Sequence, residues 1–287
     1  MSRFDTASPV FAPVSRRAFL AGAAGLAAVA LPGCGGGEGA GDDASTLTVA
    51  ASPSPHAEIL NDFAKPRLEE QGITLEVVEY TDYIKPNQDT VSGDVDANYF
   101  QHINYLENYN DENGTDLVSA GKVHFEPMGV FSTRHASLDE VEPGATVAVP
   151  NDPTNEGRAL LLLEDKGLIV LDEDAGITAT PNDIAENPYD LQFSEQEAAA
   201  LPRTVDDVDF SIINGNYAID AGLALEDAVA QEDAQSDVIQ DEYANIVCTT
   251  ADKADDERVA KLVEVLQTDE FKQYLEETFG DAVQAAF

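Results

Sequence analysis

Short apolar runs alternate with amphipathic segments along most of this chain. Residues 46–50 and 73–80 have the apolar or alternating character of strands, and the segment between them carries apolar side chains at helical spacing. Pro66 lies inside that helical pattern and is expected to kink or divide the helix, because proline lacks a backbone N–H group. A short helix closed by Gly93, then a strand and a helix within residues 96–113, complete a β-α-β-α-β order. This order predicts an α/β lobe with a largely parallel sheet.

The alternation resumes later in the chain and predicts a second α/β lobe. Further strand-like segments are residues 117–123, 128–132, 146–149, 182–186, 191–193 and 210–213. Further helices are expected at residues 195–200, 214–221, 256–267 and 269–279. Residues 244–249 are expected to form a strand that returns to the first lobe. The predicted division therefore assigns residues 46–130 and 247–287 to lobe 1 and residues 131–246 to lobe 2.

Residues 147–163 combine a buried strand, a polar loop and a helix. Asn155 is expected to cap this helix and Gly167 to end it. Arg158 then lies in the first turn, where its charge opposes the positive end of the helix dipole. A bound anion would remove that conflict, because the free backbone N–H groups and the guanidinium would share one target. The alternative is an exposed arginine that pairs with a nearby acid, and the local sequence does not decide between the two.

Residues 1–34 have the character of a lipoprotein export signal. The paired arginines within residues 15–20 resemble a twin-arginine signal, and the apolar run that follows is too short to span a membrane. The run ends at Cys34 in a sequence that resembles a lipobox, although Pro32 is an unusual residue there. We expect Cys34 to carry lipid and to hold the exported protein on the outer face of the cytoplasmic membrane, with residues 35–45 as a flexible tether.

Acidic side chains dominate the charge of the chain. They outnumber basic ones 55 to 15, which gives a net charge of -40, and the excess runs along the whole sequence. A hydrophobic content of 43% still predicts sizeable folded cores. The charge argues against a nucleic-acid partner and against an anionic membrane surface. Because high salt would screen the self-repulsion, we expect a protein from a hypersaline setting.

The sequence lacks the common motifs of enzymes and metal sites. It has no Gly-x-Ser-x-Gly elbow, no His-Glu-x-x-His and no phosphate-binding glycine loop. Its histidines and cysteines are too few and too scattered for a zinc site, and the acid runs at residues 172–174 and 252–257 lack the spacing of a calcium loop. Cys248 is expected to be a small buried hydrophobe. We therefore assign no catalytic residue, no cofactor and no metal.

Six short motifs follow one another in a fixed order along the chain. They are residues 55–60 (PHAEIL), 81–83 (TDY), 93–98 (GDVDAN), 100–102 (FQH), 151–158 (NDPTNEGR) and 213–214 (IN). Together they resemble the NlpA/MetQ family, the methionine-binding lipoproteins of ABC importers, over about residues 47–287. The chain departs from the family pattern at Ser54, where glycine is usual, and at Asn104, where proline is usual.

The resemblance implies both a fold and a function. The fold is that of a type II periplasmic-binding protein, with two α/β lobes joined by two crossover strands and a ligand enclosed between them. The function is delivery of methionine to a membrane permease driven by a cytoplasmic ATPase, and a monomer is expected. The alternatives are a binder of another small amino acid or of a methionine-containing dipeptide, and an amino-acid lyase or dehydratase on the same fold. Such an enzyme would need a general base, for which the sequence offers only His102.

Three polar residues are predicted to bind the charged groups of a free amino acid. Arg158 suits the carboxylate, because a guanidinium forms charge-assisted and bidentate hydrogen bonds. The side-chain oxygens of Asn155 and Asn214 can accept hydrogen bonds from the ammonium group. Asn214 directly follows a strand, at the edge where open α/β sheets bind ligands. Each asparagine is, on the alternative interpretation, only a cap or turn residue.

Four further residues are predicted to surround the ligand side chain. Tyr83 and Phe100 are the expected walls for a thioether, with Tyr105 behind them, because sulfur packs favourably against aromatic rings. His102 is expected to bind the ligand or to orient an aromatic neighbour. The alternatives are a core position for Phe100 and a purely structural role for His102.

Overall fold

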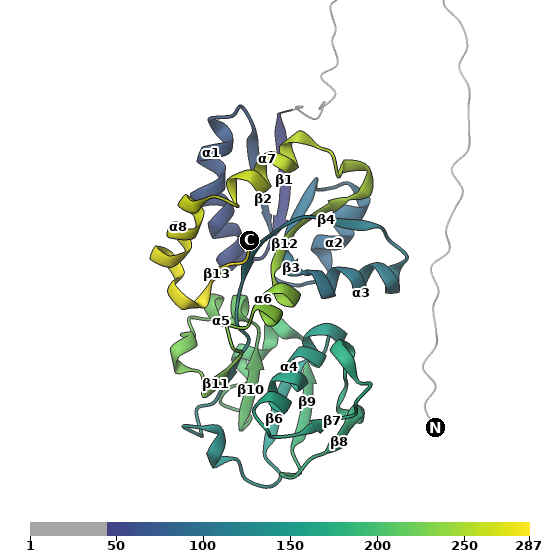
Figure 1. Cartoon of the computed structure of the whole chain (residues 1–287), viewed down its shortest axis with the longest axis vertical. Helices are drawn as coiled ribbons and strands as arrows, with labels where there is room; N and C mark the ends of the chain where they lie inside the picture. The colour runs from purple at the N-terminus through teal and green to yellow at the C-terminus, as the bar shows by residue number, and fades with distance from the viewer. Residues whose placement is uncertain (1–44) are drawn as a thin grey trace, which may run out of the picture. The chain divides into compact units, whose positions relative to one another are not determined.

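The computed structural model describes residues 45–287, so the expected export signal, Cys34 and most of the tether lie outside the described part. The described residues form two large β-sheets with helices packed against them (Figure 1). Within residues 45–287, no helix is both long enough and apolar enough to cross a membrane.

The first sheet has six strands in the order β13-β4-β12-β3-β1-β2. Its strands are β1 (Thr46–Ala51), β2 (Thr74–Glu79), β3 (Ala97–His102), β4 (Leu117–Phe125), β12 (Asn245–Thr250) and β13 (Gln284–Ala285). β1 pairs in parallel with β2 and β3, whereas β12 is antiparallel to β3 and β4. The predicted return of β12 to this sheet is confirmed, and its direction makes the sheet mixed instead of largely parallel.

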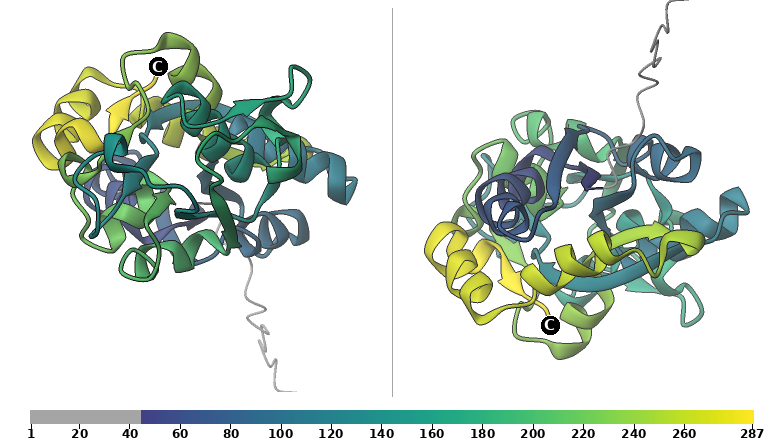
Figure 2. Two further views of the ribbon diagram at one scale, coloured as in Figure 1. Left: turned by 90° about the horizontal axis from the view of Figure 1, so that it is seen from below. Right: turned by 90° about the horizontal axis from the view of Figure 1, so that it is seen from above.

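Different helices cover the two faces of this sheet. They are η1 (Pro53–Ala57), η2 (Ile59–Ala64), α1 (Lys65–Glu69), α2 (Lys85–Ser92), α3 (Ile103–Asn113), α7 (Glu257–Val265) and α8 (Asp269–Phe279). Apolar side chains of α1, α7 and α8 share one core with β1, whereas α3 packs on the opposite face against Ile246 and Cys248 (Figure 2). Pro66 lies in the first turn of α1, where the hydrogen bonding of the long helical segment changes from the π to the α pattern while the backbone stays helical. Gly93 ends α2 in the left-handed region, at φ 82°.

The second sheet has five strands in the order β11-β5-β10-β6-β9. Its strands are β5 (Gly129–Phe131), β6 (Thr146–Pro150), β9 (Gln192–Gln196), β10 (Phe210–Ile213) and β11 (Ala230–Gln231). β6 lies between β9 and β10 and pairs in parallel with both. The helices α4 (Pro153–Asp165), α5 (Gly215–Asp220) and α6 (Asp237–Tyr243) belong to this part of the chain, and a small hairpin-like pair, β7 (Val170–Leu171) and β8 (Ile184–Glu186), follows α4.

Two segments connect the sheets. The first runs from β4 to β5, and the second runs from β11 through α6 to β12, so that α6 lies between the two halves (Figure 1). The expected lobe boundaries at residues 130 and 246 fall inside β5 and β12. Both crossings therefore lie a few residues earlier than the sequence suggested, because the apolar pattern does not change where the chain leaves one sheet for the other.

Candidate functional site

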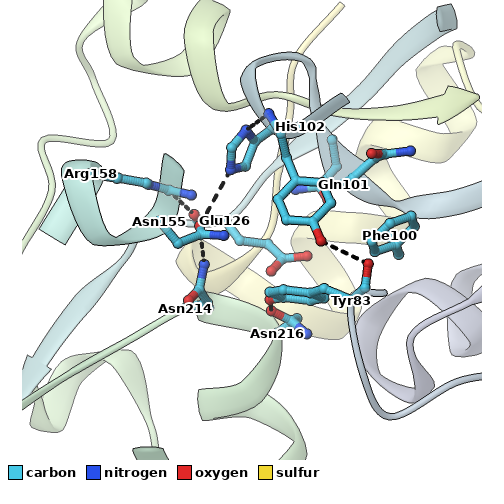
Figure 3. Close-up of a pocket in the computed structure, with 12 residues that line it drawn as sticks. Tyr83, Phe100, Gln101, His102, Glu126, Asn155, Arg158, Asn214 and Asn216 are labelled. Carbon is cyan, nitrogen blue, oxygen red and sulfur yellow. Dashed lines mark hydrogen bonds between the residues drawn. The ribbon is translucent and has the colours of Figure 1, made fainter. Parts of the chain in front are cut away.

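A buried cavity lies where strand ends of the two sheets approach each other (Figure 3). The empty space among its lining side chains is about 340 Å³, a figure that includes space open to solvent. The lining residues are Tyr83, Phe100, Gln101, His102, Tyr105, Glu126, Asn155, Arg158, Asn214, Gly215, Asn216 and Asn245. All seven residues that the sequence predicts as ligand contacts are among them.

The helix that carries Asn155 and Arg158 begins earlier than predicted. Asp152, not Asn155, is its N-cap, because the Asp152 Oδ1 atom accepts a hydrogen bond from the Asn155 backbone N–H at 3.1 Å. Pro153 occupies the first helical position, where its missing N–H group leaves no hydrogen bond unmade. Arg158 therefore lies in the second turn, where the helix dipole opposes its charge less.

Arg158 has an acidic partner inside the protein. Only 4% of its surface is exposed, and its Nε and Nη2 atoms donate to the Glu232 carboxylate at 2.7 and 2.6 Å. Nη2 also donates to the Glu126 carbonyl at 2.9 Å, and the guanidinium lies 4.3 Å from the ring centre of Tyr243. Burial opposes the charge, but Glu232 outweighs burial and raises the pKa of Arg158. The alternative interpretation is thus wrong about exposure, because Arg158 is buried, and right that the arginine pairs with an acid. Its Nη1 atom bonds to no described residue.

Asn155 connects the two other polar residues of the predicted site. Its Oδ1 atom accepts hydrogen bonds from Asn214 Nδ2 at 2.7 Å and from His102 Nε2 at 3.3 Å. His102 Nδ1 accepts the Tyr105 backbone N–H at 3.2 Å, so the ring proton is on Nε2, and Nε2 is the donor to Asn155. The oxygen of Asn155 is therefore already in use, contrary to its predicted role as an ammonium acceptor. The Oδ1 atom of Asn214 is buried and has no partner among the described residues, so it can accept a ligand hydrogen bond.

His102 is neutral at ordinary pH. It is buried, and burial together with the nearby charge of Arg158 lowers its pKa to about 3. With Nδ1 accepting and Nε2 donating, the ring joins Tyr105 to Asn155. This arrangement suits a residue that positions its neighbours.

Three aromatic rings form the apolar wall of the cavity. The ring centres of Tyr83, Phe100 and Tyr105 lie 5.8 to 5.9 Å from one another. Tyr105 Oη donates to the Tyr83 carbonyl at 2.9 Å, and Tyr83 Oη donates to Asn216 Oδ1 at 2.5 Å. The second bond connects the loop after β2 with the first turn of α5, so it joins the two halves of the molecule across the cavity (Figure 3).

Glu126 is a buried carboxyl group that sequence reasoning missed. Its Oε1 atom lies 2.6 Å from His124 Nε2 and 3.5 Å from His56 Nε2, and Tyr99 Oη bonds to His124 Nδ1. Burial lowers the pKa of His56 to about 4 and that of His124 to about 3. Burial also raises the pKa of Glu126, although His56 and Arg158 act in the opposite direction. The carboxyl group thus borders the cavity with neutral histidines behind it.

Glycine is required where the second half of the molecule meets Glu126. A Cβ atom on Gly215 would lie 2.6 Å from the Glu126 Cβ atom and 3.1 Å from the Pro127 carbonyl oxygen. Any larger residue at position 215 would push the first turn of α5 away from Glu126. Since Asn214 and Asn216 flank this glycine, their side chains depend on it for their places beside the cavity.

His56, His124 and Glu126 are also the one group of potential metal ligands found within residues 45–287. One ligand atom from each lies within 4.8 Å of the others. Two imidazoles and a carboxylate can bind transition metals. Here, however, His124 is hydrogen-bonded through both ring nitrogens, and His56 Nε2 lies 2.9 Å from Asn245 Oδ1. The Nε2 atoms of both histidines therefore already bond within the protein, and the group fits a hydrogen-bonded support for Glu126 better than a metal centre.

Residues 47–287 match the family model of the NlpA lipoproteins. The chain belongs to the NlpA lipoprotein family. Among curated members, it is 39% identical over 272 residues to the D-methionine-binding lipoprotein MetQ of Salmonella typhimurium, covering 93% of this chain and 97% of that protein. The predicted family resemblance is confirmed.

Solved structures of NlpA-like proteins have the same fold. A nutrient-binding protein from Burkholderia cenocepacia, bound to methionine, is 41% identical with a TM-score of 0.79, covering 84% of this chain and all (100%) of that one. Lipoprotein Tp32 from Treponema pallidum is 37% identical with a TM-score of 0.79, covering 84% and 99%. These similarities confirm the predicted periplasmic-binding-protein-like fold class.

Two acids of this NlpA lipoprotein complete the site without having been predicted. Glu232 pairs with Arg158, and its Oε2 atom also accepts the Met128 backbone N–H at 2.8 Å. Glu126 follows the apolar end of β4 and precedes Pro127. The sequence feature that could have predicted Glu126 as a site residue is its position directly after a buried strand. Glu232 gave no such signal, because it lies in an acidic loop like many others.

Proposed function

We propose that this chain is the substrate-binding lipoprotein of an ABC importer and that it captures methionine in the cavity between its two sheets. The observation that carries the proposal is the cavity itself. It presents an arginine N–H group, an unpartnered asparagine oxygen and a carboxyl group opposite three aromatic rings. A free amino acid with a thioether side chain needs these kinds of contact and few others. The names of the similar proteins, which include methionine binding, support the same ligand.

Each part of methionine has a partner in the proposed complex. The Nη1 atom of Arg158 donates to the ligand carboxylate. The Nε and Nη2 atoms are not free to do so, because they bond to Glu232. The ammonium group donates to Asn214 Oδ1 and to Glu126. The thioether packs against Tyr83, Phe100 and Tyr105, where each sulfur–aromatic contact contributes roughly 0.3–1.5 kcal/mol.

The proposed site binds without catalysis. The similar proteins are named for binding. His102, the general base that a lyase or dehydratase would need, has its acceptor nitrogen bonded to the Tyr105 backbone N–H. Glu126 has a raised pKa, but His124 and a backbone N–H of Asn216 already bond to it. Incubation with methionine should therefore return it unchanged, and formation of ammonia or of a keto acid would favour the lyase instead.

The proposal extends to residues outside the described part and to the working environment. Cys34 would carry the lipid after twin-arginine export and hold the protein on the outer face of the membrane, near the permease that a cytoplasmic ATPase drives. A Cys34→Ala variant should then be released into the medium. Lobe 1 would comprise residues from 46 to about 126 and from about 245 to 287, and lobe 2 the residues between them. Loss of the folded state on dialysis from high to low salt would support the hypersaline origin.

Calorimetric titration with a panel of amino acids in high salt tests the ligand. We expect saturable binding of methionine at one site per chain and much weaker binding of amino acids whose side chains are charged. Silence with methionine, together with binding of another small amino acid or of a methionine-containing dipeptide, would keep the transport role and change the cargo.

A further inference from the structure

The charges around the cavity do not balance. Among the described lining residues, Arg158 is the one permanent cation and Glu126 is the one carboxyl group, while His102 is neutral. Two more acids lie directly behind the lining. Glu232 bonds to Arg158, and Asp152 accepts hydrogen bonds from both nitrogens of Asn155 at 2.8 and 3.1 Å. One buried cation therefore faces up to three carboxyl groups.

The charge of Arg158 is already compensated by Glu232. The pair is bidentate, and the side chains of both partners are about nineteen-twentieths buried, with 5% and 4% of their surfaces exposed. Glu232 is held in place from a second side, because the Met128 backbone N–H donates to its Oε2 atom. A ligand cannot displace it without leaving a buried carboxylate unpaired. Toward the cavity, Arg158 thus offers one hydrogen-bond donor with little net charge.

Glu126 has no such compensation. Its close neighbours are His124 and His56, whose burial keeps them neutral, and a backbone N–H of Asn216 also bonds to it without bringing a full charge. Arg158 bonds to the backbone carbonyl of Glu126 and not to its carboxyl group. A cation that entered the cavity would therefore be the first full positive charge to bond to Glu126. In a poorly solvated site, an unpaired carboxylate attracts such a cation strongly.

Because Glu126 lacks a cation and Arg158 already has an anion, the ammonium group and the carboxylate of an amino acid should contribute unequally to binding. The ammonium group would supply the missing positive charge, while the carboxylate would bring a further acid to a site where carboxyl groups already outnumber the one cation. What the carboxylate gains is one hydrogen bond from Arg158, and a neutral carbonyl oxygen can accept the same bond.

We infer that the cavity selects its ligand chiefly by the α-ammonium group, so that its substrate class includes methionyl compounds with a free amine and an uncharged carboxyl group. Methioninamide is the nearest example, because an amide has the shape of a carboxylate without its charge. The inference rests on the proposed binding of methionine and deepens it.

Two deletion analogues test the ranking without adding bulk. 3-(Methylthio)propylamine keeps the amine and lacks the carboxyl group, and 4-(methylthio)butanoate keeps the carboxylate and lacks the amine. In calorimetric titrations of the full mature chain, we expect methioninamide to bind within about tenfold of methionine, the size of one neutral hydrogen bond. The butanoate should bind at least about tenfold more weakly than the propylamine, as expected when a charged hydrogen bond is lost and a carboxylate stays unpaired. A butanoate that binds as well as the propylamine would overturn the inference.

Variants of the two acids separate the inference from the proposed function. Glu126→Gln should abolish the preference for the propylamine, and Glu232→Gln should shift the preference toward the butanoate by exposing the charge of Arg158. Glu173→Gln makes the same change on an exposed loop and should leave the ranking unaltered. If Glu232→Gln does not fold, the analogue series on the parent protein still decides. Failure of methionine itself to bind would refute the proposed function, whereas tight methionine binding with the reverse analogue ranking would refute only this inference.

Discussion

Two buried carboxyl groups on either side of Arg158 differ in what they are paired with. Glu232 forms a bidentate ion pair and also accepts a backbone N–H group, so its charge is fully compensated within the protein. Glu126 is hydrogen-bonded to neutral His124 and to a backbone N–H of Asn216, lies 3.5 Å from neutral His56, and borders the cavity without a bonded cation. Both carboxyl groups are buried and lose their hydration, but Glu232 has a cation of the protein bonded to it and Glu126 does not. The difference indicates that Glu232 serves the structure and that Glu126 serves the ligand.

The largest effect is expected from removing the cation that Glu232 depends on. Arg158→Ala should lower the free energy of unfolding by about 3–5 kcal/mol, because it strands a buried carboxylate, and it should also weaken methionine binding. Arg134→Ala is the matched control, since Arg134 is 43% exposed and pairs with Asp209 at 3.4 Å. The control should cost no more than about 1 kcal/mol. Equal losses in denaturant unfolding for the two variants would refute the structural role of the Arg158–Glu232 pair.

Asn214→Ala should weaken methionine binding by about 1.5–3 kcal/mol, which corresponds to roughly 10–150-fold, because its free oxygen is an acceptor for a charged donor. The loss in stability should be small, since Asn214 makes its side-chain bond to Asn155 alone. Thermal unfolding with and without methionine measures both quantities. Unchanged affinity would show that the ammonium group does not bond to Asn214, which would leave Glu126 as its one proposed partner.

The affinity for methionine should fall as the pH falls, by about tenfold for each pH unit below the pKa of Glu126 in the free protein. The ammonium group prefers an ionised Glu126, and burial raises the pKa of this carboxyl group above its ordinary value of 4.5. His102 and His124 titrate near pH 3 and His56 near 4, so they stay neutral while Glu126 takes up its proton. Calorimetry between pH 8 and 5 tests this expectation. Glu126→Gln should bind weakly with a flat profile, and a pH profile that persists in this variant would assign the dependence to another group.

Glu156 is a further buried acid, and it has neither a cation beside it nor a hydrogen bond to each oxygen. Its substitution is expected to have the smallest effect on stability. One of its oxygens has no partner, and burial together with Glu195 and Asp152 raises its pKa from 4.5 to about 7. Because the folded state holds this proton more tightly than the unfolded state, stability is lost as the pH rises through about 7. Glu156→Gln should therefore be about 1–2 kcal/mol more stable than the parent above pH 8 and equal to it below pH 4. Glu173→Gln, by contrast, should leave denaturant unfolding unchanged at both pH values.

The regular part of the fold was accessible from the sequence because local signals and packing agree there. Pro66 lies where the helical hydrogen-bond pattern changes, and Gly93 ends a helix, as its left-handed backbone allows. The start of α4 was misplaced because Asp152 and Asn155 are both good caps, although Pro153 favours the cap that directly precedes it. The strands β7, β11 and β13 have two residues each, too few for any periodicity to be read.

The candidate site was accessible only in part, for a different reason. Arg158 and Asn214 were predicted to lie near a ligand, and they do line one cavity. Their bonding could not be predicted, because Glu232 lies 74 residues from Arg158 along the chain and Asn155 lies 59 residues from Asn214. The same holds for Glu126 and His56, which meet only when η1 and the end of β4 come together in the folded protein. Which acid is paired and which is free is thus a property of the tertiary structure.

A crystal structure of the mature protein grown with methionine would test the central claim most directly. We expect the ligand ammonium group within hydrogen-bond distance of Asn214 Oδ1 and of the Glu126 carboxyl group, with the ligand carboxylate at Arg158 Nη1 and the Arg158–Glu232 pair intact. A ligand carboxylate that displaces Glu232 from Arg158, or an ammonium group that leaves Glu126 without a positive partner, would contradict it.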